Sequence, residues 1–188
     1  MNFIHQEFIS DLSICDKLIE LFKNNIKHSA EGMCKGGINP EIKKSTDLSI
    51  PVHAVNQIDI VGKYINELIK ISQNYIEKNK FCNEGSAWGI TEDFNIQHYK
   101  PSEAFYGWHS ERTDKLPYCF RHLVWMTYLN DVENDGETEF YYQQLKIKPE
   151  KGKTVIFPVD WTHTHRGVPS KKDEKFIITG WFNYLKEV

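Results

Sequence analysis

After Gly85 the sequence consists of short runs rich in β-branched and aromatic residues, divided by turn-forming stretches. The candidate strands cover residues 87–99, 104–110, 119–130, 138–142, 144–148, 152–157, 161–166 and 174–184. Turn signals between them include KPSE at 100–103, ENDGE at 133–137 and PEKGK at 149–153. Because helical patterns do not alternate with these runs, a doubly wound α/β fold is excluded in favour of a sheet sandwich or jelly roll.

The first 85 residues have a helical pattern instead. Ser13 is placed to cap a helix, with Asp16 three residues later, and apolar residues at helical spacing continue to about Asn24. Residues 55–80 form the clearest helix, because their apolar side chains make one stripe: Ile58, Val61, Ile65, Leu68, Ile69 and Ile76. Residues 31–54 show little periodicity and are expected to be mostly loop.

The length of 188 residues suits a single domain, which we expect to comprise a mostly helical support (1–85) and a β core (86–188). The predicted class is α+β with a mainly β core. A net charge of -3 favours neither nucleic acid nor anionic membranes as partners. The four widely spaced cysteines contain no CxxC pair, and the N-terminus lacks the basic region of a signal peptide. No apolar run reaches membrane-spanning length, so we expect a cytoplasmic protein.

The stretch YGWHSE ends one candidate strand and places His109 and Glu111 two residues apart. Side chains at this spacing share one face of a strand, so imidazole and carboxylate can converge on one cation. A second histidine would complete the two-histidine, one-carboxylate set that holds non-haem Fe(II) and leaves coordination positions open. His163 and His165 compete for that place, and we favour His165 because it directly precedes an Arg-Gly-Val-Pro turn. His163 would then support or border the site. Alone, the His-x-Glu pair is a weak signal and is more typical of a solvated strand end.

In the last candidate strand, Lys175 shares a face with Ile177, Thr179 and Trp181, whereas the opposite face is nearly all apolar. The apolar face should pack against another layer. The first face has the character of a pocket wall, and an ammonium left unpaired there would be costly. A dicarboxylate ligand would pair with Lys175, with a hydrogen bond from Thr179. The alternative is a lysine at the strand entrance that reaches water.

Tyr99 and Tyr128 are candidates for the same cavity, because a buried tyrosine hydroxyl needs a hydrogen-bond partner and a carboxylate would serve. Packing in the core with a backbone partner remains the alternative for each.

In chain order, the pattern comprises Tyr99, Tyr106-x-x-His109-x-Glu111, Arg121, Tyr128-Leu129-Asn130-Asp131, Gly136-x-Thr138-x-Phe140, Gly152 before Phe157-Pro158, His165-x-Gly167-x-Pro169, Lys175 and Trp181. Over residues 87–184 it resembles the prolyl 4-hydroxylase-like branch of the 2-oxoglutarate- and Fe(II)-dependent oxygenases. The resemblance implies a double-stranded β-helix (a jelly-roll, cupin-like fold) with supporting N-terminal helices.

The resemblance also implies a role for each matched residue. Fe(II) would be held by His109, Glu111 and His165. The co-substrate 2-oxoglutarate would be bound by Lys175, Tyr128, Thr179, Tyr99 and Trp181. Arg121 and Tyr106 fall where related enzymes contact the substrate. Glu111 departs from the family, which usually has aspartate there, and we still expect it to bind iron. The carboxylate itself argues against a halogenase, in which a small residue stands at this position.

The implied reaction is hydroxylation of an unactivated C–H bond, with Fe(II), 2-oxoglutarate and O2 as cofactors and ascorbate as an additional candidate. The leading substrate is a prolyl residue of a peptide or protein. A free amino acid or another small metabolite is the alternative with the same chemistry. An alternative of another class is a non-catalytic jelly-roll binding module.

Overall fold

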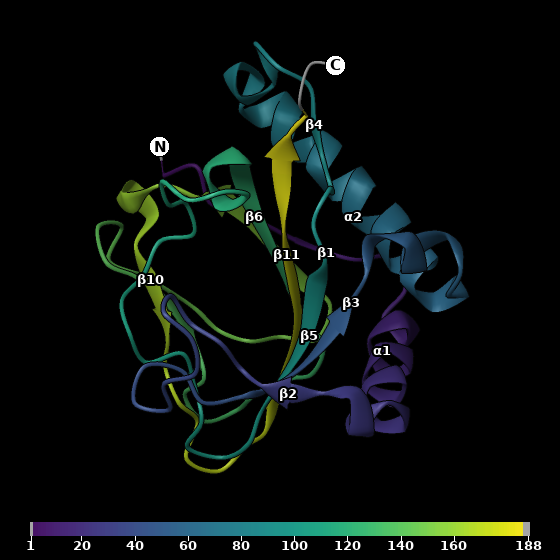
Figure 1. The fold of residues 1–188 in the computed structure, drawn as a ribbon, viewed down its shortest axis with the longest axis vertical. Coiled ribbons are helices and arrows are strands. Elements are labelled where there is room, and N and C mark those ends of the chain that lie inside the picture. The colour runs from purple at the N-terminus through teal and green to yellow at the C-terminus, as the bar shows by residue number, and fades with distance from the viewer. Residues whose placement is uncertain (1, 186–188) are drawn as a thin grey trace.

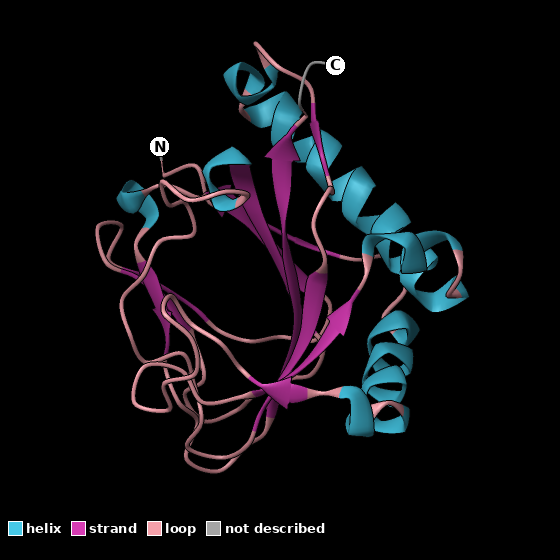
Figure 2. Cartoon of the chain, in the orientation of Figure 1, coloured by secondary structure: helices cyan, strands magenta, loops and turns pink. Residues whose placement is uncertain are grey.

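Two antiparallel sheets and two helices form the framework of the computed structural model, which describes residues 2–185 (Figures 1 and 2). The helices of the described chain are α1 (Ser13–Asn24) and α2 (Asp59–Lys78). The strands are β1 (His5–Phe8), β2 (Ala30–Glu31), β3 (Thr46–Ile50), β4 (Trp88–Gly89), β5 (Phe94–Tyr99), β6 (Arg121–Tyr128), β7 (Thr138–Phe140), β8 (Leu145–Ile147), β9 (Lys153–Pro158), β10 (His165–Gly167) and β11 (Lys175–Tyr184). Short 3₁₀ turns cover Ile26–His28, Val52–Asn56, Lys80–Asn83, Tyr118–Phe120 and Trp161–His163.

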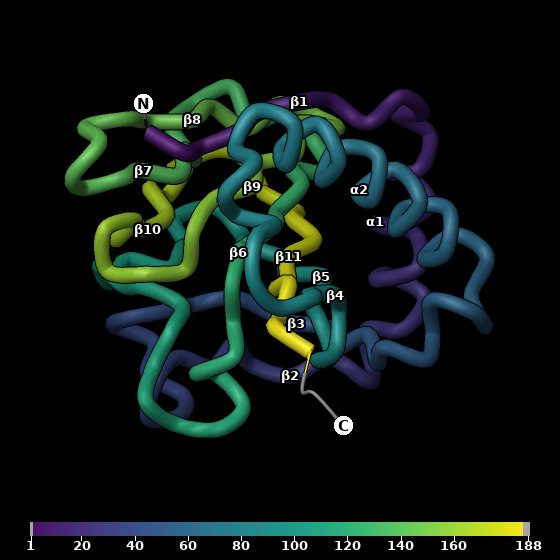
Figure 3. Tube along the Cα trace, turned by 90° about the horizontal axis from the view of Figure 1, so that it is seen from above, coloured from purple at the N-terminus to yellow at the C-terminus, as the bar shows by residue number. Residues whose placement is uncertain are grey.

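The larger sheet has eight strands, in the order β1-β9-β6-β11-β5-β3-β2, with β4 paired to the far part of β11. The smaller sheet has the order β10-β7-β8. Seen from above in Figure 3, the smaller sheet lies on one side of the larger sheet and the helices lie on the other. This arrangement is the predicted double-stranded β-helix with helical support.

The helices cover the larger sheet because each has one apolar stripe. In α1 the buried side chains include Leu18 and Phe22, and in α2 they include Val61, Leu68 and Tyr75. These side chains join one core with the residues of β5, β6 and β11 that face them. A second core fills the space between the two sheets.

Strand β11 lies inside the larger sheet, between β5 and β6. Its two faces therefore border the two cores. Phe176, Ile178 and Phe182 face the helices, as the alternation predicts, while Ile177 belongs to the second core. Gly180 lies on the helix-facing side, where a Cβ atom would come within 2.4 Å of Trp125 Cζ2. The absence of a side chain therefore lets the largest buried ring pack against the strand.

Several boundaries differ from those expected. The region read as loop contains β3, which pairs with β5, and β1 adds an unexpected edge strand beside β9. The prediction of a strand at 104–110 is wrong, because the backbone hydrogen bonds of this segment are divided between residues 42–44 and β10, and only isolated bridges form at Phe105 and His109. Helix α2 begins at Asp59, after a 3₁₀ turn, rather than at Val55. Ser13 is the first helical residue of α1, and Leu12 occupies the N-cap position without a side-chain hydrogen bond.

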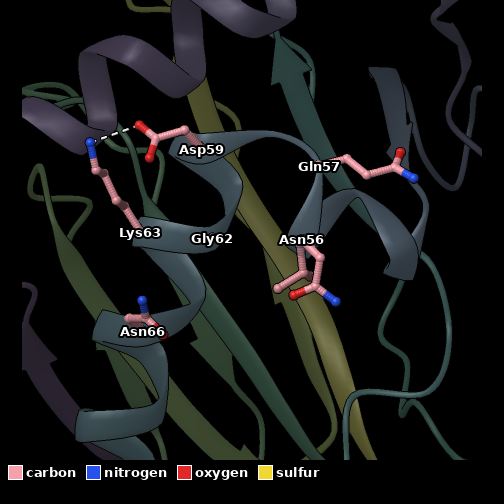
Figure 4. A pocket seen from close by; sticks show the side chains of 7 residues that line it. Asn56, Gln57, Asp59, Gly62, Lys63 and Asn66 are labelled. Atoms are coloured by element: carbon pink, nitrogen blue, oxygen red, sulfur yellow. Dashed lines mark ion pairs between the residues drawn. The ribbon is translucent and has the colours of Figure 1, made fainter.

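A shallow hollow lies beside the start of α2 (Figure 4). Its lining is mainly polar, and Lys63 Nζ lies 2.7 Å from Asp59 Oδ2 within it. Because α2 packs on the helix-covered face of the larger sheet, this hollow is separate from the core between the sheets. In the described part of the chain, no helix is long and apolar enough to cross a membrane.

Candidate metal centre

Three side chains expected at a metal site converge between the two sheets. His109 Nε2 lies 3.2 Å from Glu111 Oε1, and His165 Nε2 lies 3.5 Å from the same oxygen. The three ligand atoms all lie within 4.8 Å of one another. His109 and His165 come together because their backbones form an isolated antiparallel bridge, with N···O distances of 3.0 and 2.9 Å.

Backbone hydrogen bonds fix which nitrogen of each imidazole faces the centre. Nδ1 of His109 lies 2.9 Å from the Gly107 carbonyl oxygen, and Nδ1 of His165 lies 2.9 Å from that of His163. A carbonyl can only accept, so each Nδ1 carries a hydrogen, and Nε2 is the nitrogen that contacts Glu111 here and would offer its lone pair to a metal. The Phe105 ring stacks on His109 with centroids 3.6 Å apart. Burial lowers the pKa of His165, which makes it easier for Nε2 to give up a proton and bind a metal.

The Glu111 carboxylate is ionised at this centre. Burial acts to raise its pKa, but hydrogen bonds with His109 and His165 outweigh burial and hold the pKa well below its usual range. Its second oxygen, Oε2, accepts from Trp181 Nε1 at 3.1 Å and from Arg121 Nη1 at 3.3 Å. The two oxygens therefore have different surroundings, and Oε1 alone faces both imidazoles.

This donor set fits a divalent transition metal. Two imidazole lone pairs and one carboxylate are the facial set typical of non-haem Fe(II), although two histidines and a glutamate also bind zinc in hydrolases. Glu111 Oε1 lies 3.2 and 3.5 Å from the two imidazole nitrogens, and all three atoms lie within 4.8 Å of one another. Small adjustments of the side chains would thus allow one ion to be held by all three.

Lys175, at the start of β11, is buried on the same face of the larger sheet. Its ammonium donates to the Gly136 carbonyl at 2.8 Å and lies 5.2 Å from the centre of the Tyr99 ring. Within residues 2–185 no carboxylate forms an ion pair with it. Burial lowers its pKa to about 8, with Glu137 opposing the shift. A buried cation with only a neutral partner is suited to an anionic ligand.

The two tyrosines flank Lys175 on neighbouring strands. Tyr99 pairs with Lys175 in the β5–β11 register, and Tyr128 pairs with Ile177 in the β6–β11 register. The Tyr128 hydroxyl donates to Thr138 Oγ1 at 2.7 Å. The Tyr99 hydroxyl donates to Gln97, at 2.7 Å.

A buried polar network continues from Tyr99 toward β3. Gln97 Nε2 lies 3.4 Å from Asp47 Oδ2, and the Asp47 carboxylate also accepts from Ser45 at 2.7 Å and from Lys43 at 2.6 Å. The sequence pattern did not connect Lys43, Ser45 and Asp47, which lie in the region read as loop, with Gln97 and Tyr99 in an expected strand. It fixes the position of the Tyr99 hydroxyl at the wall of the site.

The remaining predicted residues have other neighbours in this structure. Thr179 donates its hydroxyl to the Trp125 carbonyl at 3.0 Å, so it is turned toward the backbone of β6. Tyr106 donates to the Ser102 carbonyl at 2.6 Å. Arg121, expected to contact substrate, is buried against two carboxylates, Glu92 and Glu111. His163 lies in a 3₁₀ turn and hydrogen-bonds the Asn2 carbonyl, away from the cluster.

Two residues of the site were not predicted. Phe105 precedes His109 by four positions, which would be a recognisable spacing only on a helix, and its stacking arises from the local turn. Glu92 lies between β4 and β5, within the expected strand at 87–99, and no sequence signal connects it with Arg121.

Residues 94–183 match the model of the 2OG-Fe(II) oxygenase superfamily. Probable prolyl 4-hydroxylase 9 of Arabidopsis thaliana is 25% identical to the chain over 197 residues, which cover 89% of this chain and 63% of that protein. The chain therefore spans less than two thirds of the length of this relative.

Solved structures share the fold. A viral collagen prolyl hydroxylase of Paramecium Bursaria Chlorella virus-1 gives a TM-score of 0.69 at 23% identity, over 97% of each chain. A prolyl hydroxylase of Trichoplax adhaerens, solved with a peptide fragment of hypoxia inducible factor, gives 0.76 at 15% identity, over 98% of this chain and 84% of that one. At these identities the likeness establishes the double-stranded β-helix.

Proposed function

Because residues 94–183 match the 2OG-Fe(II) oxygenase superfamily and the chain is similar to prolyl 4-hydroxylases, we propose that it is an Fe(II)- and 2-oxoglutarate-dependent dioxygenase of the prolyl 4-hydroxylase-like branch. The reaction is hydroxylation of an unactivated C–H bond. The preferred substrate is a prolyl residue of a peptide or protein, in line with the names of the relatives. A free amino acid or another small metabolite is the alternative substrate class.

One observation carries the proposal above all. Two imidazole nitrogens and one carboxylate oxygen gather within 4.8 Å, on the same side of the larger sheet as a buried lysine that has no carboxylate partner in the described chain. The metal ligands alone would also suit a zinc hydrolase. The buried ammonium adds a place for the distal carboxylate of a keto-diacid, which favours the oxygenase over a non-catalytic binding module.

In this proposal, His109, Glu111 and His165 hold Fe(II), and Lys175 pairs with the distal carboxylate of 2-oxoglutarate. When bound, the metal and co-substrate supply the oxidising chemistry: 2-oxoglutarate and O2 yield succinate and CO2, and one oxygen atom enters the C–H bond. The protein's part is to orient. The Nδ1 hydrogen bonds of both histidines hold the imidazole planes, and Tyr128 would border the co-substrate.

Apolar side chains cover the side of the centre at which His165 lies. Phe140, Phe157 and Ile177 are all buried in the core between the sheets, and Phe157 packs edge-on against His165 with centroids 4.9 Å apart. A low-polarity wall strengthens the attraction between Lys175 and a carboxylate. It also protects a reactive centre from side reactions.

The test is to measure 2-oxoglutarate-dependent succinate release and, with a library of prolyl peptides, mass gain of one oxygen atom. His109→Ala and His165→Ala should each abolish iron-dependent turnover, whereas His28→Ala, at an exposed histidine, should not. Lys175→Ala should chiefly raise the KM for 2-oxoglutarate, with Lys172→Ala as the exposed control. Normal succinate production by His109→Ala would refute the assignment of that ligand.

The cytoplasmic location and the requirement for ascorbate stay predictions. The four cysteines are free thiols in the structure, in agreement with the expected cytoplasmic location. Ascorbate is proposed only as an additional reductant, to be checked by omitting it from the turnover assay.

A further inference from the structure

The Glu111 carboxylate is divided between two environments. Oε1 faces the imidazoles of His109 and His165, at 3.2 and 3.5 Å. Oε2 accepts hydrogen bonds from Arg121 and Trp181, at 3.3 and 3.1 Å. These donors leave one oxygen for the metal and occupy the other, which sets the rotation of the carboxylate.

Arg121 is itself held from several sides. Its Nε and Nη2 each lie 2.9 Å from a different oxygen of Glu92, a bidentate pair. Its guanidinium lies 3.3 Å from the centre of the Trp181 ring and 4.6 Å from that of Tyr118. Only 7% of the residue is exposed. A cation held in this way has little freedom to swing toward a substrate.

We propose that Glu92 and Arg121 act together as a positioning pair for Glu111, so that Arg121 orients a metal ligand rather than binding substrate. The inference rests on the proposed metal site. Its physical reason is the length of the ligand: glutamate has one more rotatable bond than the aspartate usual in the family. Donors fixed on Oε2 would remove that freedom and keep Oε1 turned to the histidines.

The direction in which metal affinity changes on replacing Arg121 distinguishes a positioning role from a purely electrostatic one. The Arg121 guanidinium repels a metal cation, so if charge alone mattered, its removal would tighten metal binding. Glu92 offsets that charge through the bidentate pair. If the pair acts by geometry, loss of either member should weaken metal binding. Glu92 touches none of the three candidate ligands. If only charge mattered, replacing Glu92 would therefore weaken metal binding solely because the Arg121 charge would no longer be compensated.

A double replacement resolves these contributions. Glu92→Gln together with Arg121→Gln removes one negative and one positive charge, so the net charge near the centre stays the same. Any weakening that remains in this double variant comes from lost orientation of Glu111. Arg121→Lys keeps a cation but lacks the planar fork that reaches Glu92 and Glu111 at once, so it should restore binding only partly.

The experiment titrates the metal-free protein with Co(II), without 2-oxoglutarate, and records affinity and visible absorption. We expect Glu92→Gln, Arg121→Lys and the double variant to bind Co(II) about 10- to 100-fold more weakly than wild type, with altered absorption bands. Glu139→Gln and Arg166→Gln are matched controls, because they remove another Arg–Glu pair, beside His165, that touches no ligand. Circular dichroism checks folding, and a variant that does not fold is replaced by Glu92→Asp, whose shortened carboxylate should also weaken binding.

Affinities within twofold of wild type for Glu92→Gln and the double variant, with unchanged bands, would overturn the positioning role. Tighter binding by the double variant would overturn it too. Failure of the wild-type protein to bind Co(II) at all would instead refute the proposed metal site. The two failures are therefore distinguishable in one series of titrations.

Discussion

The affinity for 2-oxoglutarate should depend on pH through Lys175. In the ligand-free protein, burial lowers the pKa of this ammonium from 10.5 to about 8. The residue is 5% exposed, and its hydrogen-bond acceptor is the neutral Gly136 carbonyl. A dianionic ligand should bind the protonated form, and both carboxylates of 2-oxoglutarate are ionised well below pH 7. Raising the pH therefore removes the form that binds.

The size of the effect follows from the fraction of Lys175 that is protonated. With a pKa of about 8, nearly all of the free protein is protonated at pH 7, half at pH 8 and roughly one tenth at pH 9. The apparent dissociation constant should then rise about twofold at pH 8 and about tenfold at pH 9. Below pH 7 it should level off, because the lysine is already charged.

The assay is calorimetric titration of 2-oxoglutarate into the anaerobic Mn(II)-loaded protein, in buffers of different ionisation enthalpy. Above pH 8 binding should take up a proton, since the ligand raises the pKa of Lys175. Lys175→Arg is the control, because arginine stays charged over this range. Any pH effect left in Lys175→Arg belongs to the metal centre. The reasoning is refuted if wild type and Lys175→Arg lose affinity equally between pH 7 and 9.

Three further substitutions test the frame of the site. Glu111→Asp should retain turnover, reduced about 10- to 100-fold. The shorter carboxylate cannot reach both its hydrogen-bond donors, Arg121 and Trp181, and the metal. Activity no higher than that of Glu111→Ala would contradict this prediction. Gly180→Ala should destabilise the fold by about 1–3 kcal/mol in urea unfolding, because its methyl group would overlap Trp125 and Phe94, and unchanged stability would show that both rings can move. Tyr128→Phe should lower the free energy of unfolding by about 1 kcal/mol and weaken 2-oxoglutarate binding, through loss of a buried hydroxyl; an unchanged affinity would place the co-substrate elsewhere.

The parts of the fold that the sequence predicted are those with a clear period. The alternation in β11 predicted that Phe176 and Ile178 pack against a second layer, and the stripe in residues 55–80 predicted α2 to within a few residues. Strand β3 was missed because its neighbours in sequence are rich in Lys, Gly and Pro, and its pairing with β5 is a long-range contact. The local sequence pattern does not indicate which distant strand a segment will pair with.

The candidate site shows the same limit. His109 and Glu111 were chosen on the assumption of a regular strand, yet the backbone there is irregular and the convergence comes from the bridge between His109 and His165. The expected strand at 161–166 begins only at His165, which is why His163 faces the N-terminal segment instead. Glu92 could not be predicted, because its role depends entirely on which arginine lies beside it in three dimensions.

Two buried cations of this domain differ in a way that matches their proposed roles. Arg121 meets two carboxylates and two aromatic rings, so its desolvation is offset within the protein and its position is fixed. Lys175 contacts only a carbonyl and a tyrosine ring, and its lowered pKa reflects the free-energy cost of burying its charge. A dicarboxylate that binds here would pair with this charge. Because the ammonium is already desolvated in the ligand-free protein, the ligand gains the ion pair without that desolvation cost. A cation that orients a metal ligand must already be paired with carboxylates in the ligand-free protein. A cation that recognises an anionic ligand must instead have no carboxylate partner until that ligand binds.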